Sequence, residues 1–376
     1  MTVLSKLVKP DPTQSTELVE DPLPDANTSH ETENLKSRKS HALSITNIPL
    51  ELVEYIVKKL HPLEKFCCYG VSTGMRLMVE KHLPDPDTLG VYISDTTCVV
   101  FSDGKFCKYT EESGGCGYGY GTYGKKNRYG HYADRKIPFE RRKRIGFLEN
   151  VQYDKAGLNV FLSVLTKHGN HLECLKIKVK DGYNPNKFVM RIDKKLISLN
   201  MKLSVERVDL MCMSPKQMKK IISHLKSTFL SEIHLENISF GQEDNESMRE
   251  IAKMEQWKNA VRIRVHFPTT IPIRRFLHLS RFLIVRNKMT AREVVNIRNS
   301  IFKHQHIREV EVDIHDPNFD VGICRRALGP CIPDPTDPEA GFYQGTNGFV
   351  NVLMGKNDDG ETEIGMWRYD ELPVFQ

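Results

Sequence analysis

Two short stretches of this 376-residue chain contain residues whose types and spacing could support chemistry. The first is residues 119–124, GYGTYG, which has the G-x-G-x-x-G spacing of dinucleotide-binding loops. In such loops the glycines let the backbone approach a pyrophosphate between the end of a strand and the start of a helix. Here further glycines precede the stretch and basic and aromatic residues follow it, so a flexible loop fits the pattern better than a nucleotide site.

The second stretch holds His168, His171 and Cys174, which could form a cysteine nucleophile with a histidine base. The competing interpretation, which we adopt, places the histidines between a helix and a strand and makes Cys174 a core residue. The chain has no G-x-S-x-G, H-E-x-x-H, P-loop or protein-kinase motif. None of its nine cysteines belongs to a C-x-x-C pair, so we predict no metal site. We therefore expect a non-catalytic protein without a cofactor.

Residues 113–144 offer a different chemistry, because they combine glycines and five tyrosines with basic residues that include the run RRKR at 141–144. Aromatic rings can stack on bases and basic groups can contact phosphates, so nucleic-acid binding is one alternative function. The opposing interpretation is a solvated Gly/Tyr-rich basic loop with incidental charge. A formal net charge of +6 is low for a dedicated nucleic-acid binder and favours the loop.

Composition sets the broad class of the protein. The chain is 39% hydrophobic and 27% charged, as expected for a globular protein of two or three domains. It has no apolar run of about 18 residues, so we predict no transmembrane helix. Its N-terminus turns polar, with proline and acidic residues, within ten residues, which argues against a secretory signal. The scattered cysteines favour the reducing cytoplasm or nucleus, and the polar composition of residues 1–43 predicts a disordered leader.

Residues 44–84 form a short apolar segment after this leader. Pro49 suits the first turn of a helix, and Leu52, Ile56 and Leu60 follow at the spacing of one helical face. His61 and Pro62 end that helix, and two further short helices are expected before residue 84. A module this small buries little surface alone, so its apolar residues need either a partner or the following domain to cover them. Periodicity alone does not separate a docking surface from ordinary core, and we interpret the segment as a docking module.

The rest of the chain alternates between strand-like and helical segments. Residues 89–112 predict a β hairpin that turns at Asp103-Gly104. Residues 150–315 repeat a helix and a strand at intervals of roughly 20–35 residues, typical of α/β repeat proteins. Residues 316–376 predict a proline-rich loop and a closing hairpin around residues 358–360. The predicted fold class is α/β: a helical N-terminal module followed by a degenerate leucine-rich-repeat-like solenoid with β hairpins at its start and end.

Two motifs in this order resemble a known family. Residues 48–65, IPLELVEYIVKKLHPLEK, with the Val-Ser-x-x-x-Arg pattern at 71–76, resemble an F-box. Residues 254–260, MEQWKNA, resemble the E-Q-W-K-N-A hallmark of the FTH domain, which follows the F-box in a large nematode F-box family. The strand and helix at 282–294 are similar to the ending of that domain. The resemblance covers roughly residues 45–315 and identifies 150–315 as the FTH, repeat-like domain.

The resemblance implies the substrate-recognition subunit of a Skp-cullin-F-box ubiquitin ligase. The F-box would dock on a Skp-type adaptor, and through it on a cullin, while the C-terminal domain captures an unidentified target protein. Val71, Met75 and Met78 would instead face the module's own core. A scaffold whose F-box has decayed is a further alternative. The expected adaptor-binding residues are Ile48, Pro49, Leu52, Ile56, Leu60, Leu63 and Phe66.

Overall fold

The computed structural model describes only part of the chain, which divides into two units, residues 1–83 and residues 84–376. The two units are considered separately below. The described residues are 48–60, 65, 73–82, 86–103, 105–122, 143–180, 183–237, 242–345, 348–356 and 361–372.

The first unit contains two described helices, α1 (Leu50–Lys59) and α3 (Thr73–His82). Pro49 is the N-cap of α1, with an acidic residue in the first turn and two lysines in the last, which complements the helix dipole. Val53 and Val57 of α1 are buried together with Val79 of α3. Of the second helix predicted from Pro62, only Lys65 is described, and it is helical.

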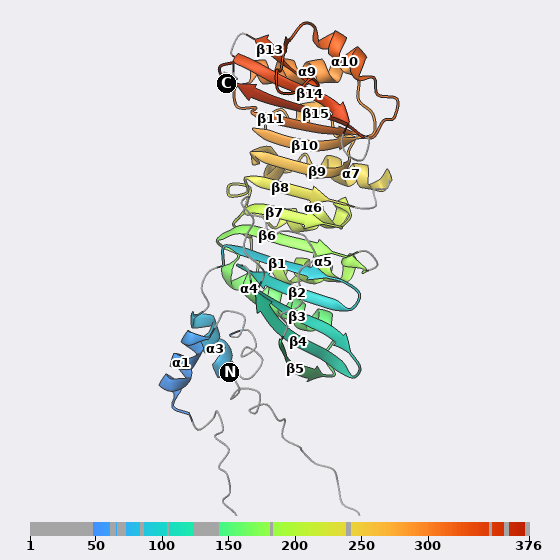
Figure 1. Ribbon diagram of the computed structural model, residues 1–376. Helices are drawn as coiled ribbons and strands as arrows, with labels where there is room; N and C mark the ends of the chain where they lie inside the picture. Colours follow the sequence, from blue (N-terminus) through green and yellow to red (C-terminus); the bar gives the residue numbers. More distant parts are fainter. Residues whose placement is uncertain are drawn as a thin grey trace, which may run out of the picture. The chain divides into compact units, whose positions relative to one another are not determined.

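The second unit is built on one sheet of fifteen strands (Figure 1). Its strand order is β12-β13-β14-β15-β11-β10-β9-β8-β7-β6-β1-β2-β3-β4-β5. The strands are β1 (Thr88–Ile93), β2 (Thr97–Ser102), β3 (Lys105–Glu112), β4 (Gly115–Thr122), β5 (Lys143–Glu149), β6 (Leu172–Val179), β7 (Val205–Met211), β8 (Glu232–Glu236), β9 (Arg262–Pro268), β10 (Arg281–Arg286), β11 (Glu309–Ile314), β12 (Ile332–Pro333), β13 (Ala340–Gly345), β14 (Gly348–Lys356) and β15 (Thr362–Tyr369).

Helices connect the central strands and cover one face of the sheet, which Figure 1 shows behind the strands. Three of them begin at a polar cap followed by proline or a capping box, at Asn184, Ser214 and Thr290. The elements are α4 (Tyr153–His168), α5 (Pro185–Ser198), α6 (Pro215–Ser223), α7 (Gln242–Ile251), α8 (Glu255–Asn259), the 3-10 turn η4 (Ile273–Arg275), α9 (Ala291–Lys303) and α10 (Val321–Leu328).

The middle of the sheet is parallel and its ends are antiparallel. Strand β1 runs parallel to β6, and β6 to β11 lie side by side in chain order, all parallel. Alternate residues of these strands are buried under the helices, as in the pattern of β11. The mixed α/β class is confirmed. The chain forms one continuous mixed sheet, and its description as a leucine-rich-repeat-like solenoid stays a prediction.

The two predicted hairpins are present. Strands β2 and β3 pair antiparallel on either side of a turn at Asp103, whose φ of 46° is the left-handed conformation that Asp tolerates. Strands β14 and β15 pair antiparallel near the C-terminus, and β15 pairs with β11. The C-terminal hairpin therefore extends the parallel strands directly.

The prediction of a loop over residues 113–144 is wrong for 115–122, which form β4, and for 143–144, which open β5. Glycine here provides space for neighbouring side chains: a Cβ at Gly121 would lie 2.6 Å from the ring of Phe106, and one at Gly117 would overlap the Glu112 carboxylate. High glycine content thus marked close packing in a strand rather than a turn. Residues 123–142 lie outside the described residues.

Two helices were not predicted. Helix α5 begins at Asn184 and Pro185 and buries four residues of one face. Helix α10 falls inside the proline-rich loop predicted at the start of residues 316–376, where prolines flank it on both sides. Asp320 caps α10, since its side chain accepts a hydrogen bond from the backbone N–H of Ile323 at 2.9 Å. Because α10 is short and lies between prolines, the sequence did not indicate a helix there; in the structure α10 packs beside α9.

Candidate functional site

The first candidate surface is the exposed side of α1. Leu52 and Ile56 are 50% and 39% exposed, although both are large apolar residues one helical turn apart. Tyr55 is exposed beside them, and Lys59 lies over its ring at 5.6 Å. Exposed apolar side chains that share one helix face are the usual mark of a docking surface.

The predicted adaptor-binding residues divide into three groups in the structure. Pro49, Leu52 and Ile56 are exposed. Ile48 and Leu60 are only partly buried and pack against the small core of Val53, Val57 and Val79, as does Met78. Leu63 and Phe66 lie outside the described residues. Sequence reasoning missed Leu50 and Tyr55, which are both exposed; Tyr55 is three positions from Leu52, so helical spacing could have found it.

A polar contact on the other side of α1 fixes this helix to α3. Glu54 accepts a hydrogen bond from Lys81 at 2.8 Å and lies 2.9 Å from Nε2 of His82. The Lys81 hydrogen bond, followed by that of His82, lowers the pKa of Glu54 below its usual value. Together with the buried valines this contact holds the helices so that Leu52 and Ile56 remain outward.

The second candidate surface is the face of the sheet that the described helices leave uncovered, and a fully buried carboxylate lies within it. Asp209 of β7 accepts two hydrogen bonds from Arg207, at 2.8 and 3.0 Å, and Lys176 of β6 lies 3.1 Å away. Burial alone would raise the pKa of Asp209, but the His234 and Arg207 side chains and the charge of Lys176 outweigh it and hold that pKa well below its usual range. This network stabilises the sheet and leaves Asp209 no capacity to bind a partner.

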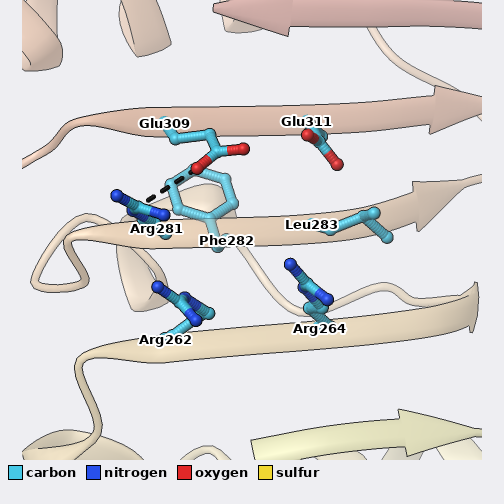
Figure 2. Close-up of a pocket in the computed structure, with 7 residues that line it drawn as sticks. All are labelled: Arg262, Arg264, Arg281, Phe282, Leu283, Glu309 and Glu311. Atoms are coloured by element: carbon cyan, nitrogen blue, oxygen red, sulfur yellow. Dashed lines mark ion pairs between the residues drawn. The ribbon is translucent and has the colours of Figure 1, made fainter. Parts of the chain in front are cut away.

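Ion pairs continue along the same face towards the C-terminal strands. Glu232 of β8 pairs with Arg262 of β9 at 2.7 Å, and Arg281 of β10 pairs with Glu309 of β11 at 3.4 Å. Figure 2 shows a pocket on β9, β10 and β11, which Arg262, Arg281 and Glu309 help to line. Arg264 also lines this pocket and has no hydrogen bond or ion pair to any other described residue.

The next strands carry carboxylates instead. Glu311 of β11 is flanked by Glu309 on its own strand, and Asp313 lies directly opposite Glu363 of β15 in the sheet register. Desolvation and then the neighbouring Glu309 raise the pKa of Glu311 to about 7, and desolvation and then Glu363 raise the pKa of Asp313. Opposed like charges destabilise a sheet, so this acidic end is not explained by stability alone.

The structure disfavours the catalytic alternatives. Residues 119–122 of the G-x-G-x-x-G stretch lie in β4, so they do not form a loop between a strand and a helix. Burial raises the pKa of Cys174 to about 12, which keeps it a neutral thiol and not a nucleophile. His168 ends α4, and His171 lies between α4 and β6 as expected. In the described parts of the chain, no group of three or more His, Cys, Asp or Glu residues could hold a metal ion.

The described helices include none that is long and apolar enough to cross a lipid bilayer.

Comparison with known proteins identifies a domain in the middle of the chain. Residues 186–322 match the family model of the FTH domain, which is found with F-box proteins and is generally non-catalytic. No F-box family model matched the chain, and no curated protein matched it in sequence. The FTH prediction is therefore confirmed for 186–322, from α5 to the first turn of α10.

The hallmark motif of this domain performs a structural task. Trp257 of α8 is fully buried, and its Nε1 donates a hydrogen bond to the carbonyl of Arg275 in the following segment at 3.1 Å. Gln256 donates to the carbonyl of Leu225 in the preceding segment at 2.7 Å. His278 lies 2.9 Å from the carbonyl of Trp257. The motif thus joins neighbouring segments of the domain.

Proposed function

We propose that this chain is the substrate-recognition subunit of a Skp-cullin-F-box ubiquitin ligase, acting in the cytoplasm or nucleus. Residues 44–84 serve as the F-box and dock on a Skp-type adaptor, which links the chain to a cullin. The FTH-containing unit captures the target protein. The single observation that carries the proposal is the outward position of Leu52 and Ile56 on α1 in a chain whose middle matches the FTH domain.

The energetics of α1 support docking over simple core packing. Val53 and Val57 already supply the contacts with α3, so Leu52 and Ile56 are not needed to hold the unit together. Burying a large aliphatic side chain contributes about 1.5–3 kcal/mol, and two such anchors with Tyr55 beside them could form the centre of a small interface. Ile48 and Leu60 would contribute mainly by fixing the position of α1.

No catalytic residue is required for this role, because the other ligase subunits perform the ubiquitin transfer. The chain needs only an adaptor surface and a target surface. The uncovered sheet face supports the second requirement, since it is broad, rich in charge and free of covering helices in the described part of the chain (Figure 1). An extended face of stacked strands is a common binding surface in repeat-like proteins.

An adaptor pull-down tests the proposal. Wild-type chain is compared with the double variant Leu52→Asp plus Ile56→Asp, which places two charges on the docking face without touching the buried valines. Because a buried unpaired charge is costly, we expect adaptor recovery to fall by at least about tenfold.

The matched control is Met190→Asp plus Ile197→Asp on α5, where both apolar residues are also exposed but belong to the second unit. This control should recover the adaptor as well as wild type does. Equal recovery by the α1 variant would refute the proposal. Failure of wild type itself to recover adaptor would favour a scaffold whose F-box has decayed.

A further inference from the structure

The uncovered sheet face carries a short strip of residues that are not satisfied within the described part of the protein. Arg264, Leu283 and Glu311 occupy matching register positions on β9, β10 and β11. Figure 2 shows Leu283 between the Arg264 side chain and the Glu311 side chain. We call Arg264, Leu283 and Glu311 the β9–β11 strip.

The strip differs from the rest of the face in how its charges are used. Lys176, Arg207 and Asp209 neutralise one another on β6 and β7. By contrast, Arg264 makes no ion pair with any described carboxylate, and its charge reaches Glu311 only as a longer-range attraction, while Glu309 is the hydrogen-bond neighbour of Glu311. A cation and an anion are therefore held two strands apart, with an apolar side chain between them and no direct ion pair for either charge.

An aromatic ring extends the strip at its acidic end. Trp367 of β15 folds over Gly365, where a Cβ would overlap its ring, and Gly365 is the register partner of Glu311. The Trp367 side chain is partly exposed. A carboxylate next to an exposed indole suits the amine or guanidinium of a basic side chain, which can form an ion pair and a cation–π contact together.

We propose that the β9–β11 strip binds an extended segment of the captured protein, with an acidic side chain of that segment at Arg264 and a basic one at Glu311. This inference rests on the proposed function, because it specifies the class of target segment that the FTH-containing unit takes. The occupant follows from charge complementarity: a segment with one charge of each sign satisfies both ends and places apolar atoms over Leu283.

The strand spacing sets the distance between the two charges in the target. Neighbouring strands lie about 4.8 Å apart, so Arg264 and Glu311 are separated by about 9.6 Å across β10. A polyproline II segment advances about 3.1 Å per residue with three residues per turn, so positions i and i+3 lie on one side about 9.3 Å apart. An ideal β-strand places same-side residues about 6.7 or 13.4 Å apart and fits less well. We therefore expect the acidic and basic residues to stand three positions apart.

Synthetic peptides test the inference with the full chain. The probe is a ten-residue fluorescein-labelled peptide with the core Glu-Pro-Pro-Lys, compared with Gln-Pro-Pro-Gln, Lys-Pro-Pro-Lys and Glu-Pro-Pro-Glu by fluorescence anisotropy at pH 8. We expect the Glu-Pro-Pro-Lys peptide to bind at least about fivefold more tightly than the neutral one at low salt, a factor typical of partly exposed charge pairs. The preference should disappear in high salt.

Single charge reversals should redirect this preference. Arg264→Glu creates a wholly acidic strip that selects Lys-Pro-Pro-Lys, and Glu311→Lys creates a wholly basic strip that selects Glu-Pro-Pro-Glu. Arg292→Glu on α9 and Glu246→Lys on α7 change net charge equally at exposed positions of the helical layer, and they should retain the wild-type preference.

Three outcomes overturn the inference: wild type does not distinguish charged from neutral peptides, wild type binds none of the four, or Arg264→Glu keeps the preference shown by Arg292→Glu. Thermal melting confirms that each variant is folded, and Arg264→Gln replaces Arg264→Glu if the reversal unfolds the chain. Because no adaptor is present, peptide selectivity can persist when the adaptor pull-down fails. In that case the ligase proposal falls and the binding strip remains.

Discussion

Replacing Asp209 with asparagine tests whether the buried ion pairs of this carboxylate stabilise the sheet. The carboxylate is fully buried and holds Arg207 and Lys176, which are themselves largely buried. An asparagine side chain at this position would retain one acceptor but would leave both cations without a buried counter-charge, although Arg207 keeps a distant contact to Glu232 at 3.9 Å. Because removing one partner of a buried ion pair costs about 3–5 kcal/mol, we expect a loss of about 3 kcal/mol in the free energy of unfolding.

Urea denaturation followed by circular dichroism measures this loss, with Glu250→Gln as the matched control. The Lys219–Glu250 pair is shorter, at 2.6 Å, but both side chains are well exposed, so its loss should change stability by less than about 1 kcal/mol. If Asp209→Asn were no more destabilising than Glu250→Gln, the argument from burial would be refuted.

Asp209→Asn should also change how the free energy of unfolding depends on pH. The folded-state pKa of Asp209 is depressed, so its contribution is complete above the unfolded pKa of about 4 and is lost as the pH falls through the lower folded value. Wild type should therefore lose stability below about pH 4 more steeply than Asp209→Asn does. Parallel stability profiles for the two proteins in that range would contradict this assignment.

Two further predictions concern other positions of the second unit. Glu311 has a folded pKa of about 7 against 4.5 for the free side chain. The unfolded chain therefore loses this proton first, and the free energy of unfolding should fall as the pH rises from about 4.5 to 7. In urea titrations Glu311→Gln should remove on the order of 1 kcal/mol of that fall, and an unchanged dependence of stability on pH would contradict the prediction. Trp257→Phe deletes the hydrogen bond to Arg275, which leaves that carbonyl without a donor and part of the ring site empty. Thermal and urea denaturation should therefore show a loss of about 2–3 kcal/mol in the free energy of unfolding. A loss below about 1 kcal/mol would show that the motif is not structural.

The sequence was sufficient to predict those helices, strands and turns that depend on residues close together in the chain. The β2–β3 hairpin was predicted because Asp103 and the following glycine favour a tight turn between β-prone runs. Strands such as β9 and β11 were expected because polar and apolar residues alternate along them. This alternation places one face of the strand in the core and the other in solvent. Helix α9 lies within the predicted alternation of helices and strands over residues 150–315, since its apolar positions recur at helical spacing.

Other elements depend on contacts that sequence spacing does not display. Strand β4 is glycine-rich because Phe106 and Glu112 of β3 lie against its glycines, and that fact exists only once the strands are paired. Helix α10 was missed because the prolines around it suggested a loop, while its cap and its packing beside α9 decide otherwise. Helix α5 does have a signal in the sequence, because Phe188, Ile192 and Leu196 recur at helical spacing after Pro185.

The candidate surfaces, too, were predictable from the sequence only in part. Helical periodicity placed Leu52, Ile56 and Leu60 on one stripe, yet Leu60 packs on the core of its unit while the other two remain exposed. The stripe is wide enough to serve both core and solvent, so spacing could not separate them. The charged sheet face was not predicted at all, because its rows are assembled from strands that are distant in the sequence.

Burial and pairing now indicate where on that face a target could be held. A charge that is already neutralised by its neighbours gains little from a partner, and removing it from those neighbours has a cost. This argues against β6 and β7, where Asp209 is saturated by Arg207 and Lys176. On β9 and β11, Arg264 and Glu311 form no ion pair with described residues, so a ligand with groups of opposite charge can supply one to each. Target capture should therefore concentrate at the C-terminal half of the sheet, away from the strands whose charges hold the fold together.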